Sequence, residues 1–296
     1  FWQSFPTGLE IRDAAKATAQ MTAWLWSPEA PAMDMRHYDT RAHGLNATYE
    51  DVQPGMSVAY GVARTSELTL FPAGEVPTKA AMVAMARAGE GRPLLVASPT
   101  YLHSTGVFGV WSLPDRSTPL KKTVEDKLDS VLAFYQQQVD ERHWYGFWTF
   151  GDYIHSYNNA QHVWYYDWGG HAWQNTELGV PLWVWTSFLR TGRGDVFRMA
   201  EAQTRNTSET NVYHIGPMQG LGSRHNVVKW GDGAKEARVS QAAHWRPYYY
   251  LTTDERTGDI MRAQLTADLA AVKHDPMRLA QPVLPQDPKF PGRIRI

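Results

Sequence analysis

RTGRGDVFR, from Arg190 to Arg198, is the stretch that decides the fold. A related stretch, RTGDIMR, runs from Arg256 to Arg262 and is two residues shorter. In each, a glycine predicts the end of one helix, and an aspartate, Asp195 or Asp259, predicts the cap of the next. The two aspartates are 64 residues apart, which suits a repeated antiparallel helix pair with its loops. The pattern therefore favours helical hairpins packed side by side.

Apolar periodicity around this stretch indicates a mainly α fold. Apolar residues recur at three- and four-residue spacing over 123–144, where Thr123 is the expected N-cap, and again from Leu178 to Leu189. Trp183 and Trp185 lie within the second of these helices and are expected in its core. Alternation of strands with helices and a Gly-rich phosphate loop are both lacking, which counts against a doubly wound sheet. The predicted architecture is an α/α toroid of helical hairpins.

Three segments are predicted along the chain. Residues 1–75 contain strand-like runs punctuated by prolines and are expected to be the end of an N-terminal β region and a linker. Residues 76–275 are the predicted toroid, which we expect to be the catalytic domain and to be partial. Within it, Val239–Leu251 predicts a helix that Pro247 kinks. Residues 276–296 are rich in proline, which is typical of an extended tail or linker.

Charge and cysteine content exclude several classes of partner and site. Lys plus Arg number 29 and Asp plus Glu number 30, giving a formal net charge of −1 and no basic run that would attract nucleic acid. No apolar run approaches the length of a membrane span, and no signal-peptide pattern is present. The chain has no cysteine, so disulfides and thiolate metal sites are excluded. We therefore expect neither nucleic acid nor a membrane as a partner.

The stretch from His143 to Trp185 carries seven of the 13 tryptophans and four of the 11 histidines in 43 residues. Tyrosine, asparagine and a pair of glycines are interleaved with them. Large flat side chains with polar groups suit the wall of a concave site that holds a polar, ring-shaped ligand. A carbohydrate cleft is therefore the working hypothesis.

Two segments are expected to meet at the mouth of the toroid. One runs from Trp164 to Glu177, and the other is the Gly-rich loop from Asn211 to Gly233, which has no helical period. The predicted catalytic residues are His225, His171, Tyr213 and Arg224. The predicted substrate-binding residues are Tyr166, Trp168, Trp173, Asn175, His214, Asn226, Lys229, Trp230 and Arg246.

These residue types fit β-elimination of a uronate better than hydrolysis. An eliminating lyase needs a cation or amide that neutralises the uronate carboxylate, a base that removes the acidified proton, and an acid that protonates the leaving oxygen. The candidates are Arg224, Lys229 or Asn175 for the carboxylate, His225 or His171 for the base, and Tyr213 for the acid. The expected partner is therefore an acidic polysaccharide or oligosaccharide substrate.

Alternatives remain open at this point. A glycoside hydrolase needs two carboxylates beside the scissile bond, and Asp167 and Glu177 are candidates, or Asp152 in place of one. A non-catalytic carbohydrate-binding domain would use the same aromatic residues without turnover, and a helical structural domain would use them as core. HxH and HExxH spacings are absent, so no metal site and no cofactor is predicted. A calcium ion that bridges a uronate stays an open alternative.

Several motifs carry a resemblance to a known family. They are WLWSPEAPAMDMRHYD (Trp24–Asp39), YED (Tyr49–Asp51), YGVART (Tyr60–Thr65), the His225–Asn226 pair and WGDG (Trp230–Gly233). With them the chain resembles the exo-rhamnogalacturonan lyase family (PcRGLX and YetA-like proteins, polysaccharide lyase family 26).

The resemblance implies a larger parent protein with a β-sandwich, a central α/α toroid that bears the active site, and a further β domain. This chain would then hold the end of the β-sandwich and much of the toroid, with the flanking β domains of the parent as its partners. The implied activity is exo-acting β-elimination of rhamnogalacturonan in pectin degradation. A substrate of that class favours a secreted or periplasmic protein.

Overall fold

The computed structural model describes residues 8–25, 27, 59–91, 93–154, 157–164, 173–224, 230 and 235–271. Its α-helices are α1 (Lys79–Glu90), α2 (Pro99–Thr105), α3 (Pro119–Glu141), α4 (Val180–Thr191), α5 (Gly194–Arg205), α6 (Arg246–Thr252), α7 (Glu255–Ala263) and α8 (Ala267–Ala271). A π-helix and short 3₁₀ helices accompany them, namely η3 (Asn206–Thr210), η4 (Ala237–Ser240), η5 (Ala242–His244) and η6 (Gln264–Thr266). The strands form antiparallel pairs: β1 (Gly8–Arg12) with β2 (Gln20–Trp24), β3 (Tyr157–Asn158) with β4 (Val163–Trp164), and β5 (Gly222–Ser223) with β6 (Lys235–Glu236). The mainly α prediction is confirmed.

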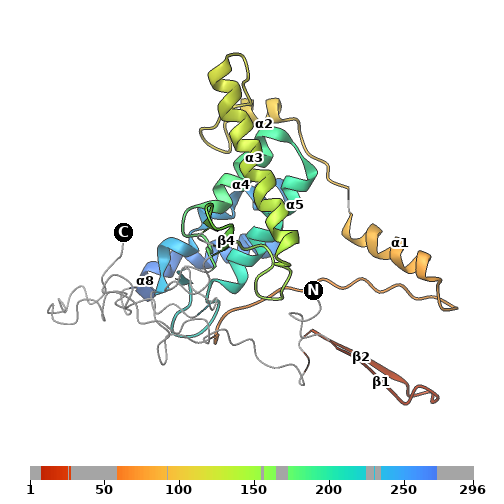
Figure 1. The fold of residues 1–296 in the computed structure, drawn as a ribbon. Coiled ribbons are helices and arrows are strands. Elements are labelled where there is room, and N and C mark those ends of the chain that lie inside the picture. The colour runs from red at the N-terminus through yellow and green to blue at the C-terminus, as the bar shows by residue number, and fades with distance from the viewer. Residues whose placement is uncertain are drawn as a thin grey trace.

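The helices gather around α4 (Figure 1). α4 packs along α5 and contacts α2, and α3 lies against it through the rings of Tyr135 and Trp183, whose centroids are 5.6 Å apart. In Figure 1, α1 and the β1–β2 hairpin stand apart from this helical body. Over the part of the chain that the structure describes, no helix combines the length and the apolar character needed to cross a membrane.

The first predicted hairpin is confirmed. α4 carries Pro181 in its first turn and ends where Gly192 takes a left-handed conformation (φ 65°), with its N–H donating to Phe188 O at 2.7 Å. α5 then starts two residues later. Asp195 is not the N-cap, because Arg193 holds that position, and Asp195 instead lies in the first turn and accepts a hydrogen bond from Gln136 Nε2 at 2.9 Å.

The second predicted junction is wrong in its position. α6 and α7 do form a hairpin, but the turn is at Thr253 (φ 54°), and Asp254 caps α7 by accepting from Thr257 N at 2.8 Å. Gly258 lies inside α7, where a Cβ would be 2.7 Å from Tyr249 Cε2. This glycine therefore permits close packing of α6 on α7 and does not end a helix. Asp259 is likewise inside α7 and pairs with Arg262.

Two other helix boundaries differ from the prediction. α3 begins after Thr118, which caps it by accepting from Lys121 N at 3.3 Å, so Thr123 lies within the helix. The single helix expected over Val239–Leu251 is divided into η4, η5 and α6. Pro247 lies in the first turn of α6, where its missing N–H costs no hydrogen bond, and it therefore starts a helix instead of kinking one.

Two aromatic clusters make most of the core. The first lies on α4 and α5 and contains Trp185, whose Nε1 donates to Thr204 Oγ1 at 2.9 Å, with Trp183 partly buried against it. The second contains Trp144, Tyr153, Ile154, Trp164 and Trp173. Both expectations for Trp183 and Trp185 are confirmed, and much of the aromatic stretch is interior.

The π-helix η3 continues α5 and is wholly buried. Asn206 in η3 donates through Nδ2 to the carbonyl oxygens of Trp148 (2.9 Å) and Phe150 (3.0 Å). The turn that supplies these carbonyls lies directly on the α5 backbone, because a Cβ at Gly151 (φ 95°) would be 2.1 Å from Ala202 O. π-helical turns recur at functional sites, and here the loop that η3 binds through Asn206 leads at Gly151 into the buried Asp152.

We expect Gly151→Ala to lower the free energy of unfolding by about 2 to 5 kcal/mol, because the new methyl group meets a backbone carbonyl and the positive φ adds strain. Gly106→Ala is the matched control, since Gly106 also has a positive φ (64°) but open space around its Cβ position. The control should lose only about 1 to 2 kcal/mol. Urea denaturation followed by tryptophan fluorescence measures both, and equal losses would contradict the close approach.

Candidate functional site

The structure describes part of the predicted site. The predicted residues that lie outside the described residues are His171, Tyr166, Trp168, His225, Asn226 and Lys229, together with Asp167 of the hydrolase alternative. The described ones are Tyr213, Arg224, Trp173, Asn175, His214, Trp230 and Arg246. Their contacts show which of them come together.

Asn175 joins the two segments that were expected to meet. Its Nδ2 donates to Ser223 O at 2.8 Å and to Arg224 O at 3.1 Å, at the end of β5. Its backbone N–H donates to both carboxylate oxygens of Asp152, at 3.0 and 3.2 Å. Asn175 has a positive φ of 55° and is fully buried. The asparagine is therefore a buried connection between loops, with its amide nitrogen already bonded to the protein.

Four charged side chains form a partly buried ion network beside this connection: Glu177, Arg224, Glu236 and Arg238. Arg238 Nη2 lies 3.0 Å from Glu177 Oε1 and also pairs through Nε with Glu236. Arg224 Nε lies 3.5 Å from Glu177 Oε1. Burial raises the pKa of Glu236, against the attraction of both arginines. The network holds the turn after Trp173 against both strands that flank residues 225–234.

Lys235, on β6, is a buried cation at the centre of the site, with an exposed fraction of 1%. Its Nζ donates to Ser223 Oγ at 2.9 Å and to Trp230 O at 2.7 Å. The same Nζ lies 5.2 Å from the centre of the Tyr213 ring, a cation–π distance. Tyr213 is also 1% exposed, so its ring forms part of the floor beneath Lys235.

Two partly exposed tryptophans lie above this floor. Trp230 meets Trp148 edge to face at 5.3 Å, and Trp148 meets Phe147 in the same way at 4.7 Å. The Arg64 guanidinium carbon lies 5.9 Å from the Phe147 ring centre. We call these residues the aromatic–cationic cluster: Arg64, Phe147, Trp148, Tyr213, Trp230 and Lys235. A partly exposed pair of indole rings beside cations is a surface that an acidic sugar ring can contact.

His214 lies at the edge of the cluster, where the segment from Tyr60 to Glu67 crosses it. Its backbone N–H donates to Gly61 O at 2.6 Å, and its ring Nε2 lies 3.0 Å from Glu209 O. Burial lowers the pKa of His214, so the ring is neutral at neutral pH. His214 therefore holds the crossing segment in place, and its contact with substrate stays a prediction.

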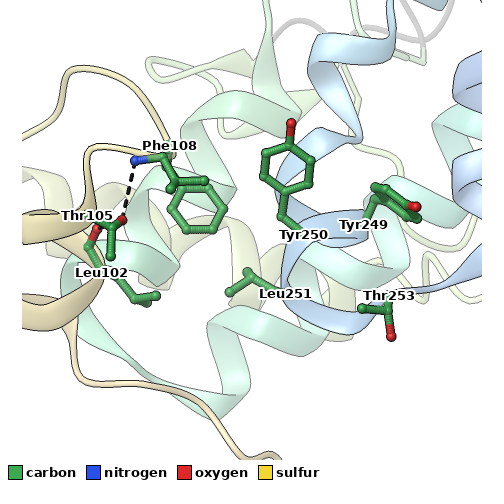
Figure 2. A pocket seen from close by; sticks show the side chains of 8 residues that line it. Leu102, Thr105, Phe108, Tyr249, Tyr250, Leu251 and Thr253 are labelled. Carbon is green, nitrogen blue, oxygen red and sulfur yellow. Dashed lines mark hydrogen bonds between the residues drawn. The ribbon is translucent and has the colours of Figure 1, made fainter.

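Trp173 and Arg246 lie in other surroundings. Trp173 is 4% exposed and packs in the second core cluster, 6.0 Å from the Trp144 ring. Arg246 starts α6 and lies over the Tyr250 ring at 5.9 Å. Tyr250 lines a pocket of about 420 Å³ between α2 and α6, shown in Figure 2. The side chains labelled there are mostly apolar, and none of the described lining residues belongs to the predicted site.

Sequence reasoning missed Lys235, Glu236 and Arg238 as members of the site. Their signal was the charged run K-E-A-R that follows the Gly-rich loop directly. It also missed Arg64, which lies within the YGVART motif. Within the described residues, His, Asp and Glu side chains do not gather in groups of three that could hold a metal ion.

Comparison with known proteins identifies both parts of the chain. Residues 92–296 match the model described as "PcRGLX-like protein C-terminal alpha/alpha toroid domain", and residues 1–87 match "PcRGLX-like protein central beta sandwich domain". These matches confirm the predicted α/α toroid with an N-terminal β-sandwich segment. They correct the implied domain order, because the sandwich is described as central and the toroid as C-terminal.

A relative from Bacillus subtilis (strain 168), named "Uncharacterized protein YetA", is 48% identical over 278 residues. The aligned part is 94% of this chain and 32% of the relative, so the chain spans about a third of the length of that curated protein. The resemblance found in the motifs is thus confirmed over nearly the whole chain, and the chain belongs to the PcRGLX-like family.

Proposed function

We propose that the protein carrying this chain is a polysaccharide lyase that cleaves a rhamnogalacturonan-like polymer by exo-acting β-elimination. The observation that supports this proposal is the aromatic–cationic cluster beside Arg224, in a family whose name refers to such a lyase. Cations at the site favour a substrate with carboxylates, and indole rings favour a sugar. Residues 76–275 are the proposed catalytic domain, with 1–75 as the end of the β region and 276–296 as a linker.

In the proposed reaction, a base removes the proton from carbon 5 of the uronate, next to its carboxylate. The electron pair forms a double bond to carbon 4, the bond from carbon 4 to the glycosidic oxygen breaks, and that oxygen takes a proton from an acid. No cofactor is needed for this balance. Neutralising the carboxylate acidifies the proton and supplies much of the stabilisation of the transition state.

His225 or His171 is the proposed base and Tyr213 the proposed acid. His225 follows Arg224 directly and so begins the segment between β5 and β6. Tyr213 is buried beneath Lys235, and a substrate oxygen would have to reach it through the aromatic–cationic cluster. Arg224 already pairs with Glu177, and the Asn175 amide nitrogen is bonded to two carbonyls, so both act on the carboxylate mainly by holding the loop.

Glu177 and Asp152, the described carboxylates of the hydrolase alternative, fit a hydrolase poorly. Glu177 lies in the ion network with two arginines, and Asp152 accepts hydrogen bonds from the backbone N–H groups of Tyr153 and Asn175. A hydrolase needs two carboxyl groups that can reach the scissile bond, and these two are already bound to arginine or backbone groups of the protein. This contrast favours the lyase over hydrolysis by Asp167 and Glu177.

We expect incubation with rhamnogalacturonan to produce the ultraviolet absorbance of an unsaturated uronate. His225→Ala and His171→Ala each remove a candidate base, and the variant that loses the true base should lose about 10² to 10⁴ in kcat. His143→Ala is the matched control, because His143 is exposed at the end of α3 and should leave the rate unchanged.

Two outcomes would contradict the lyase. Reducing ends that appear without the chromophore would indicate a hydrolase, and sugar binding without any turnover would indicate a carbohydrate-binding domain.

Glu177→Gln tests the role of this carboxylate in the ion network. Removing its charge takes a carboxylate partner from both Arg224 and Arg238, and we expect a loss of about 3 kcal/mol in the free energy of unfolding. Asp259→Asn breaks the exposed pair with Arg262 and should cost less than about 1 kcal/mol. Denaturant titration compares the two. A fully stable Glu177→Gln protein that no longer cleaves glycosidic bonds would instead identify a catalytic carboxylate.

A further inference from the structure

We propose that Arg64, which lies in the part of the chain that matches the β-sandwich model, binds the carboxylate of an acidic sugar at the site of the toroid. The choice of ligand rests on the proposed function. The proposal extends it, because neither the motifs nor the family descriptions assign this residue. It makes the site composite, with one cation supplied from outside the toroid.

The segment from Tyr60 to Glu67, which we call the strap, is bound to the toroid on both sides of Arg64. On one side, Gly61 O accepts from His214 N, and Gly61 lies so close that a Cβ would be 2.4 Å from Ile215 O. Its φ of 109° also requires glycine. These contacts place the strap against the start of the Gly-rich loop.

On the other side of Arg64, the strap is bound to the buried π-helix. Thr65 N donates to Glu209 Oε2 at 2.6 Å, and Ala63 N donates to Glu209 O at 3.4 Å. Glu67 then pairs with Arg205 Nη2 at 2.6 Å. Because backbone groups on either side of Arg64 are bonded, its Cα position is set by the toroid and not by the β region alone.

The Arg64 guanidinium has a buried edge. Its Nη1 is buried and makes no hydrogen bond within the described residues. Burial lowers the pKa of Arg64, and Glu209 offsets part of this effect through its charge. Buried guanidinium N–H groups are normally bonded, and a planar, bidentate oxygen acceptor such as a carboxylate suits them best. An arginine of this kind beside a proposed sugar site is therefore a binding group for an acidic substrate.

Contacts around the aromatic–cationic cluster place Arg64 at the same site as Lys235. From Arg64 they pass through Phe147, Trp148 and Trp230 to Lys235, and from Lys235 to the Tyr213 ring. Tyr213 in turn contacts the strap, because a Cβ at Gly61 would be 3.0 Å from Tyr213 Cδ1. The cluster is therefore one continuous set of contacts that includes two cations and two partly exposed indole rings.

The test compares binding of a rhamnogalacturonan oligosaccharide in its free-acid and methyl-esterified forms. Calorimetry is done on the full-length protein with His171→Ala and His225→Ala together as background, so that both candidate bases are removed and cleavage does not interfere. The background protein should bind the acid form at least about 10-fold more tightly than the ester. Arg64→Gln should weaken binding of the acid about 10- to 100-fold and change binding of the ester less than about 2-fold.

Two further variants control for charge and folding. Arg262→Gln removes an exposed arginine from α7 and should change neither affinity more than about 2-fold. Arg64→Lys keeps the charge but loses the planar guanidinium group, so it should still bind the acid form more tightly than the ester, by a smaller factor than the background protein. This variant keeps the test decisive if Arg64→Gln fails to fold. Melting temperatures identify the folded variants.

The outcomes separate this inference from the proposed lyase. An unchanged acid preference in Arg64→Gln, or an equal loss for both forms of the sugar, overturns the role of Arg64 even if the wild type forms unsaturated product. A lost preference in Arg64→Gln supports the role, even if the wild type cleaves by hydrolysis. A background protein that binds neither form overturns both.

Discussion

The site depends on one buried asparagine. Asn175 bonds through its side chain to the carbonyls that end β5 and through its backbone to Asp152, so two loops far apart in the sequence share a single buried residue. Asp152 follows the turn whose carbonyls bond Asn206 and whose Gly151 lies on α5. The π-helix η3 is thus bonded to the turn before Asp152, and Asp152 is bonded to the loop that carries Asn175. A shift in any one of them would move the strand end from which Arg224 and the following residues start.

The charged groups at the site form two sets: an ion network of two glutamates with two arginines, and two cations beside aromatic rings. Glu177 and Glu236 balance Arg224 and Arg238 within the ion network, and a group of this kind is costly to bury but strongly destabilising to break. Lys235 contacts the Ser223 hydroxyl, the Trp230 carbonyl and the Tyr213 ring, and Arg64 lies near the Phe147 ring and within the influence of the Glu209 charge. Two cations therefore lie beside the aromatic rings, which is an arrangement that an anionic sugar can use.

Sequence patterns predicted the features that depend on neighbouring residues, such as helix ends and the apolar face of a helix. Gly192 was recognisable as a helix end, and Trp185 as core, because a left-handed turn and an apolar helix face leave short-range signals. Gly258 was misjudged because a glycine that admits a neighbouring ring looks the same in sequence as one that ends a helix. Pro247 was misjudged because the break before it, at η5, has no strong signal of its own.

The candidate site was less predictable, because its contacts join distant residues. The bond from Thr65 to Glu209 spans 144 residues, and no pattern in a single sequence indicates such a pair. Tyr213 and His214 were chosen for their chemistry, but the structure buries Tyr213 and bonds the partly buried His214 to neighbouring backbone groups, so packing decides their surroundings. Trp173 illustrates the same point, since an aromatic side chain in a sugar-binding stretch can equally fill a core.

The strap has a consequence for how this protein can be divided. The boundary between its two family domains lies between residues 87 and 92, yet the backbone bonds of Gly61, Ala63 and Thr65 go to the far side of that boundary. A toroid separated at this boundary would leave the Glu209 carboxylate and the His214 N–H facing water at a buried π-helix. The smallest piece that keeps every described bond of the site therefore begins before Gly61, and exchange of whole domains between relatives would have to carry the strap with the toroid.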